Sequence, residues 1–77
     1  MTDTIDLRLF ATFAKYMPEN ASAFPIEKGM TIARLIEGLP ISPADAKLIF
    51  VNGTRATLQS RLDGGERVGI FPPVGGG

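Results

Sequence analysis

The sequence predicts an α+β fold in which a single sheet of four to five strands carries one helix on one face. Residues 5–13 alternate between apolar and polar side chains, which is typical of a half-buried strand. Residues 32–39 place apolar side chains at i, i+3, i+4 and i+7, which is typical of a helix with one apolar stripe. Because such a short helix is unstable alone, its stripe is expected to pack against the sheet.

Length and composition narrow the class of protein. A chain of 77 residues forms one domain with a small core. Eight basic and eight acidic residues cancel, which argues against nucleic acid as the main partner. The sequence has no cysteine and no histidine, so it offers no disulfide framework and no thiolate metal site. No run is apolar enough to span a membrane and no signal peptide is evident, so a cytoplasmic location is expected.

The first two strands are expected to form an antiparallel pair. The apolar face of residues 5–13 consists of Ile5, Leu7, Leu9, Ala11 and Phe13. The opposite face consists of Asp6, Arg8, Phe10 and Thr12, so one aromatic ring interrupts the polar side. Residues 21–28 are predicted to form the second strand, and Pro25 places it at an edge because proline lacks an N–H group.

Capping residues predict where the helix begins and ends. Thr31 is a plausible N-cap, because its hydroxyl can accept a hydrogen bond from the first helical turn. Gly38 weakens the helix and Pro40 ends it. Ser42 and Pro43 predict one further short turn.

The second half of the chain is predicted to add three strands. Residues 47–51 are apolar at nearly every position, so this strand is expected to be interior, and alternation does not decide whether Leu48/Phe50 or Ile49/Val51 faces the helix. Asn52-Gly53 predicts a tight turn into a short strand at residues 55–57. Leu58 and Leu62 are expected to close one end of the core.

The last strand is predicted at residues 66–71, after a turn at residues 63–65 that Asp63 and Glu66 help to shape. Val68 and Ile70 share one face of this strand, and Arg67, Gly69 and Phe71 share the other. We therefore expect a domain at residues 1–71 and a flexible tail at residues 72–77.

Four segments together resemble the MoaD/ThiS-like sulfur carriers, which have the ubiquitin-like β-grasp fold, and above all the small subunit of molybdopterin synthase. The segments are Leu9-Phe10-Ala11, Val51-Asn52-Gly53, the run from Leu62 to Val68, and the ending Phe71-Pro72-Pro73-Val74-Gly75-Gly76-Gly77. Among these four segments, the ending is the one that is specific to this family. The resemblance implies that the first and last strands lie side by side and parallel in the middle of a mixed sheet.

The resemblance also implies a chemistry at Gly77, whose α-carboxylate is ionised at neutral pH. A separate ubiquitin-activating-like enzyme adenylates this carboxylate with ATP, and a persulfide protein supplies sulfur to form a thiocarboxylate. The carrier then donates the sulfur during molybdopterin (molybdenum cofactor) synthesis. The resemblance further implies a non-catalytic subunit, which is not expected to bind a cofactor or a metal itself.

In this hypothesis, the residues of the tail each contribute to its insertion into a partner. Pro72 and Pro73 stiffen the exit from the domain and Val74 anchors the base of the tail. Gly75 and Gly76 have no side chain, so the end can enter a narrow channel. Extended at about 3.3 Å per residue, the tail reaches about 20 Å into a partner.

Three residues are predicted to bind a partner. Phe10 and Phe71 are expected to be neighbours on the sheet face away from the helix, where the resemblance implies contact with the large subunit of molybdopterin synthase. The alternative is that they are ordinary exposed apolar residues. Arg55 stands where the family often has an apolar residue, so the partner surface differs in detail or the partner is a different enzyme.

Two further functions stay open. The first is that the chain is a sulfur carrier for thiamine or another sulfur-containing metabolite, although the Pro72-Pro73 ending argues against thiamine. Otherwise, it is a ubiquitin-like interaction module, or a tag conjugated to lysines, without sulfur chemistry.

Overall fold

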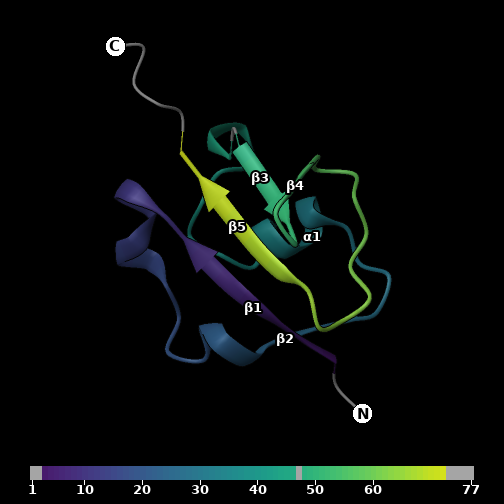
Figure 1. Cartoon of the computed structure of the whole chain (residues 1–77). Coiled ribbons are helices and arrows are strands. Elements are labelled where there is room, and N and C mark those ends of the chain that lie inside the picture. The colour runs from purple at the N-terminus through teal and green to yellow at the C-terminus, as the bar shows by residue number, and fades with distance from the viewer. Residues whose placement is uncertain (1–2, 47, 73–77) are drawn as a thin grey trace.

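A five-stranded mixed sheet carries the fold, and α1 (Ile32–Glu37) covers one of its faces (Figure 1). The structure is a computed structural model that describes residues 3–46 and 48–72. The sheet has the order β2-β1-β5-β3-β4. Its strands are β1 (Asp3–Leu9), β2 (Phe24–Ile26), β3 (Leu48–Val51), β4 (Thr54–Ala56) and β5 (Arg67–Phe71). This arrangement confirms the predicted fold class.

The last strand occupies the centre of the sheet. β5 pairs in parallel with β1, with Leu7 opposite Val68 and Leu9 opposite Ile70. Its other edge pairs antiparallel with β3. The predicted parallel pairing of the first and last strands is therefore confirmed.

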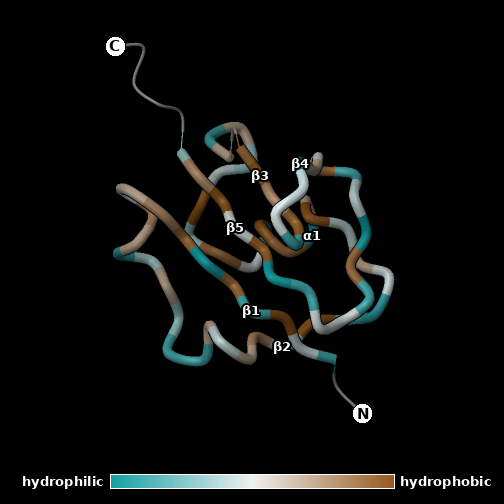
Figure 2. Tube along the Cα trace, viewed as in Figure 1, coloured by the Kyte–Doolittle hydropathy of each residue, from teal (hydrophilic) through white to brown (hydrophobic). Residues whose placement is uncertain are grey.

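The core lies between the sheet and α1. Apolar residues alternate along β1 and β5 (Figure 2), and Ile32, Leu35 and Ile36 are the buried residues of α1. The most deeply buried side chains are Ile5, Leu7, Ile32, Leu35, Ile36, Leu62, Val68 and Ile70. Burying a side chain of this size stabilises the fold by about 1.5–3 kcal/mol. Along the described residues, no helix is long and apolar enough to cross a membrane.

The prediction that the first strand continues to Phe13 is wrong. β1 ends at Leu9, and a 3₁₀ helix (Ala11–Tyr16) follows. Ala11 has φ 53°, a left-handed conformation that costs roughly 1–2 kcal/mol for a residue with a Cβ. The turn leaves Ala11 exposed but still buries Phe13, now from the 3₁₀ helix. Alternation in the sequence therefore persisted beyond the end of the strand.

The second strand is also shorter than predicted. A short 3₁₀ helix (Ala21–Ala23) replaces its first part, and β2 contains only Phe24–Ile26. β2 does lie at the edge of the sheet, where Pro25 sits opposite Thr4. The predicted edge position of Pro25 is confirmed.

Local signals predicted the start of the helix correctly, but α1 ends at Glu37, two residues before the predicted end at residue 39. The Thr31 hydroxyl accepts a hydrogen bond from the backbone N–H of Arg34 at 3.2 Å, and Gly38 is the C-cap. The Ser42 hydroxyl likewise accepts from the N–H of Ala44 at 3.3 Å, in the next 3₁₀ turn (Pro43–Asp45). Both predicted caps are confirmed.

The structure decides the orientation of β3. Ile49 is buried and Val51 packs against the core, so Leu48 and Phe50 point to the opposite face. Asn52 and Gly53 both have positive φ, 53° and 81°, as a two-residue hairpin requires. β4 starts one residue earlier than predicted, at Thr54.

Glu66 fixes the turn that precedes β5. Its carboxylate oxygens accept hydrogen bonds from the backbone N–H groups of Asp63 and Gly64, each at 2.7 Å. The N–H of Gly65 donates to the carbonyl of Thr4 at 2.6 Å, which ties the turn to β1. These contacts confirm that Glu66 shapes the turn.

Gly64 is the position in this turn where we expect a side chain to be costly. It has φ 108°, and a Cβ there would lie 2.9 Å from the Cβ of Asp3. Gly64→Ala is expected to lower the free energy of unfolding by at least about 1 kcal/mol, measured by denaturant titration.

Gly38→Ala is the control, because its φ is −86° and the nearest atom is 3.5 Å away. This variant is expected to stay within about 0.5 kcal/mol of the wild type. Equal stability of the two alanine variants would contradict the account of the turn.

Candidate functional site

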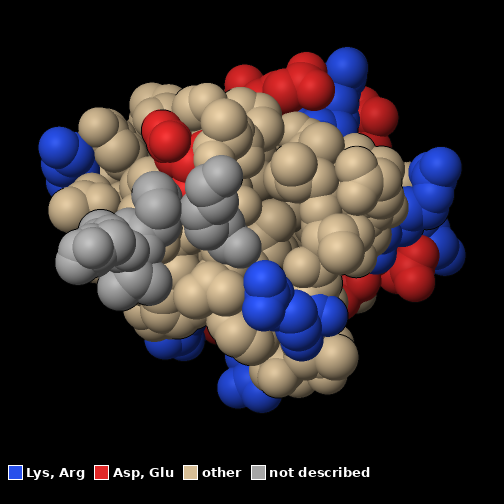
Figure 3. Space-filling model, turned by 90° about the horizontal axis from the view of Figure 1, so that it is seen from above, with Lys and Arg blue, Asp and Glu red and all other residues tan. Residues whose placement is uncertain are grey.

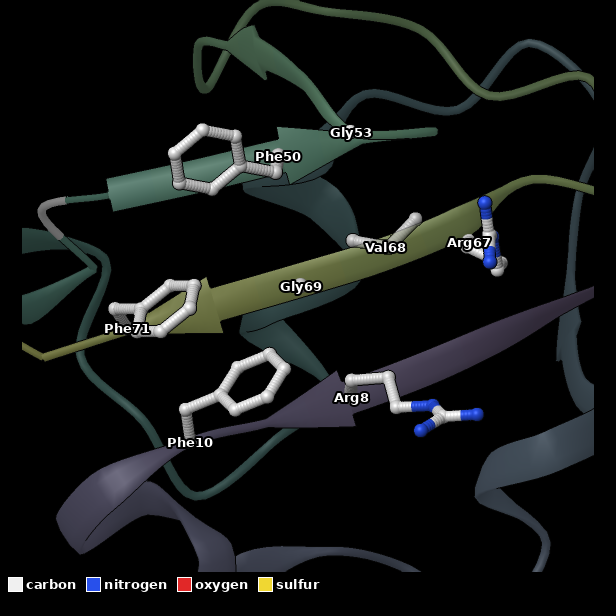
Figure 4. A pocket seen from close by; sticks show the side chains of 8 residues that line it. All are labelled: Arg8, Phe10, Phe50, Gly53, Arg67, Val68, Gly69 and Phe71. Atoms are coloured by element: carbon white, nitrogen blue, oxygen red, sulfur yellow. The ribbon is translucent and has the colours of Figure 1, made fainter.

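Three phenylalanine side chains gather on the sheet face opposite α1 (Figure 4). The rings of Phe10 and Phe71 are stacked, with centroids 4.3 Å apart and planes 6° from parallel. Phe50 meets Phe71 edge-to-face, with centroids 5.8 Å apart and an interplanar angle of 81°. Phe10 remains 38% exposed, so these rings form a surface and not part of the core.

Strand register explains why the rings meet. Leu9 pairs with Ile70, and the N–H of Phe10 donates to the carbonyl of Ile70 at 3.1 Å, so Phe10 lies beside Phe71. On the other edge of β5, Phe50 pairs with Gly69. Side chains directly opposite one another share a face of the sheet.

Gly69 leaves room for the Phe10 ring. A Cβ at Gly69 would lie 3.1 Å from Cε2 of Phe10, closer than ordinary van der Waals contact. The glycine therefore lets the ring lie over the central strand. A larger residue at this position would force the ring to shift.

A hollow of about 350 Å³, which we call the aromatic hollow, lies over Gly69 between these rings and two arginines. Figure 4 shows the rings of Phe10 and Phe71 at one end and the side chains of Arg8 and Arg67 at the other. Phe50 flanks it from β3, and Gly53 and Val68 complete its lining.

The two arginines differ in their surroundings. Nε and Nη2 of Arg8 each donate to a carboxylate oxygen of Asp6 at 3.2 Å. This hydrogen bonding, together with the negative charge of Asp6, raises the pKa of Arg8 above its usual value. Among the residues that the structure describes, Arg67 has no carboxylate within ion-pair distance. The hollow therefore presents positive charge.

No metal centre is evident in the described part of the chain. Residues 3–46 and 48–72 contain no group of three or more His, Cys, Asp or Glu side chains placed to hold a metal ion. The aromatic hollow itself is lined by apolar and positively charged side chains.

The structure places some of the predicted site residues together and does not describe others. The structure brings Phe10 and Phe71 together, as expected. Arg55 is exposed on β4 opposite Phe50, so it shares their face of the sheet, but it does not line the aromatic hollow. Pro72 is the last residue described, and the predicted tail residues Pro73, Val74, Gly75, Gly76 and Gly77 lie outside the described residues. The roles of all these residues, and the domain boundary at residue 72, stay predictions.

Phe50 was not predicted as a site residue, and Gly69, Arg8 and Arg67 were given no role from the sequence. The Asn52-Gly53 hairpin contained a usable signal for Phe50. A two-residue turn there places Phe50 opposite Arg55, and a charged side chain is not expected on the face that packs against the helix.

The chain matches a known protein family over nearly its whole length. The model of the ThiS family matches residues 7–77, including the glycine-rich ending. The chain belongs to the ThiS family. The predicted resemblance to MoaD/ThiS-like, ubiquitin-like sulfur carriers is therefore confirmed. A search of curated proteins found no significant match to this ThiS-family chain.

Two solved structures from Haloferax volcanii share the fold of this ThiS-family chain. The solution structure of the HVO 2177 protein is similar with a TM-score of 0.76 and 24% identity, covering 99% of this chain and 88% of that one. The crystal structure of SAMP1 is similar with a TM-score of 0.66 and 21% identity, covering 96% of this chain and 99% of that one. These likenesses confirm the β-grasp fold.

The stacked rings of Phe10 and Phe71 are expected to stabilise each other. In a double-mutant cycle with Phe10→Ala and Phe71→Ala, we expect a coupling of about 0.5–1.5 kcal/mol in the free energy of unfolding. Each single variant serves as the other's control. Strictly additive losses would show that the rings touch without a favourable interaction.

Proposed function

We propose that this chain is a sulfur carrier that is adenylated and then thiocarboxylated at the carboxyl group of Gly77. One observation carries the proposal: the match to the ThiS family runs through the ending to residue 77. The domain supplies the docking surface, and the catalytic groups belong to its partners.

The proposed chemistry overcomes the poor electrophilicity of a carboxylate. The Gly77 carboxylate attacks the α-phosphorus of ATP on an adenylating enzyme, which releases pyrophosphate and leaves an acyl adenylate. A persulfide sulfur of a donor protein then attacks the carbonyl carbon and displaces AMP. A second thiol of the donor cleaves the sulfur–sulfur bond, which leaves a disulfide on the donor and a thiocarboxylate on Gly77.

Within this function, we propose that the chain is the small subunit of molybdopterin synthase, acting in the cytoplasm. The supporting geometry is the stacked pair of the exposed Phe10 and the half-buried Phe71, which lies at the end of β5 from which the tail continues. A large subunit that covers these rings would receive the tail beside them. Arg55 on the same face would adjust the fit of that subunit.

The family match supports the alternatives equally well. The same thiocarboxylate would serve a carrier for thiamine or another sulfur-containing metabolite, and the same acyl adenylate would serve a tag conjugated to lysines. Identification of the product that receives the sulfur, or of a lysine linked to Gly77, distinguishes these outcomes.

Intact-mass measurement tests the proposed chemistry directly. After incubation with ATP, the adenylating enzyme of the same organism and a persulfide donor, the mass is expected to change by the replacement of one oxygen by sulfur. Deletion of Gly77 is expected to abolish this change without altering thermal stability, because the core consists of residues before the tail. A Gly77 deletion variant that still accepts sulfur would refute the role of Gly77.

Phe71→Asp tests the docking face. This substitution places a charge on the proposed interface, so we expect at least tenfold weaker binding to the large subunit of molybdopterin synthase, measured by calorimetry. Thr54→Asp is the control, because Thr54 is exposed and outside the aromatic hollow. A collapse in thermal stability with unchanged binding would show instead that Phe71 serves the core.

A further inference from the structure

The aromatic hollow is polarised along the strands that form it. Phe10 and Phe71 make its apolar end, next to the point where the chain leaves β5. Arg8 and Arg67 make the opposite end, and no acidic side chain is among the lining residues. A complementary group therefore has an apolar part toward the tail and a negative charge away from it.

The arginine end is arranged to receive a carboxylate. Arg8 and Arg67 come from neighbouring strands, in which Asp6 pairs directly with Arg67. Asp6 holds Arg8 through two of its N–H groups, and a guanidinium has five. Among the described residues, no acceptor binds the remaining N–H groups of Arg8 or the side-chain N–H groups of Arg67, and guanidinium groups match the geometry of a carboxylate.

The geometry favours an inserted side chain over a stacked base. Phe10 and Phe71 are 4.3 Å apart and already in contact, so no planar ring fits between them. Phe50 stands edge-on to Phe71 and offers no parallel partner for such a ring. Gly69 lines the hollow without a side chain, which leaves room for an apolar side chain of a partner beside the Phe10 ring.

The position of the hollow points to the enzyme that acts on the tail. Phe71 is both a wall of the hollow and the last residue of β5, so an enzyme holding the following residues lies against this surface. Figure 3 shows the end of the molecule where β1 and β5 finish, and there most Lys, Arg, Asp and Glu side chains lie toward the outline. The hollow itself provides the apolar part of an interface through Phe10 and Phe71 and the charged part through Arg8 and Arg67.

We propose that the aromatic hollow receives an apolar side chain of the adenylating enzyme, flanked by a carboxylate of that enzyme that binds Arg8 and Arg67. This inference rests on the proposed function, because it names the partner that activates Gly77. The apolar contact buries the rings of Phe10 and Phe71 beside the point where the tail begins. The carboxylate fixes the orientation of the carrier on the enzyme and accelerates their encounter.

The test is ATP–pyrophosphate exchange by the adenylating enzyme of the same organism, measured against carrier concentration. Arg67→Glu and Arg8→Glu are each expected to raise the KM for the carrier about tenfold at low salt, with kcat nearly unchanged. Because added salt screens these charges, the difference from the wild type is expected to shrink as ionic strength rises. Phe50→Ala is expected to raise KM by a factor that salt does not reduce.

The matched control is Arg34→Glu, which changes the net charge equally but lies on α1, on the other face of the sheet. Its KM is expected to equal that of the wild type, apart from any effect of net charge shared by all three variants. Arg67→Gln, which removes the charge without reversing it, is expected to give an intermediate KM. Thermal melts of each variant identify any loss that comes from unfolding, and Arg67→Gln replaces Arg67→Glu if the latter is unstable.

The outcomes separate this inference from the proposed function. If the wild type supports exchange but the arginine variants match Arg34→Glu, the inference is wrong and the proposed function stands. If the arginine variants raise the KM for ATP and not that for the carrier, the hollow binds a nucleotide and the inference is also wrong. If the wild type supports no exchange at all, the proposed function itself fails.

Discussion

The hydrogen bonding of β5 to both β1 and β3 is the constraint on which the rest of the structure depends. Without β5, the β1–β2 and β3–β4 pairs have no common strand. The turn that leads into β5 is accordingly well fixed, by the Glu66 carboxylate on one side and the carbonyl of Thr4 on the other. The strand at the centre of the sheet, β5, is thus the last of the described elements in the sequence.

The same five residues of β5 serve two surfaces because side chains alternate along a strand. Val68 and Ile70 are fully buried against the helix side. Gly69 and Phe71 face outward, where Gly69 admits the ring of Phe10 and Phe71 stacks on that ring. A change of register by one residue would exchange the two sets and destroy both surfaces together.

The sequence was most informative where a local interaction decides the structure. The Thr31 cap, the Ser42 cap and the Asn52-Gly53 turn each depend on neighbouring residues alone, and each was predicted correctly. The end of β1 was not, because the apolar alternation continues through residue 13 and nothing in the sequence marks the left-handed conformation of Ala11. The parallel pairing of β1 and β5 was predicted from resemblance to a family and not from periodicity. The proximity of Arg8 and Arg67 was not predicted, because it depends on the register of that pairing, which places Asp6 opposite Arg67.

The central position of β5 has a consequence for synthesis on the ribosome. While the nascent chain lacks its final strand, β1 and β3 each have an unpaired edge, and the rings of Phe10 and Phe50 have no Phe71 to contact. Exposed strand edges of this kind invite association with other chains, and pairings distant in sequence form slowly. The aromatic hollow and the end of β5 therefore form together, when β5 joins the sheet. An incomplete chain does not present the completed hollow to a partner.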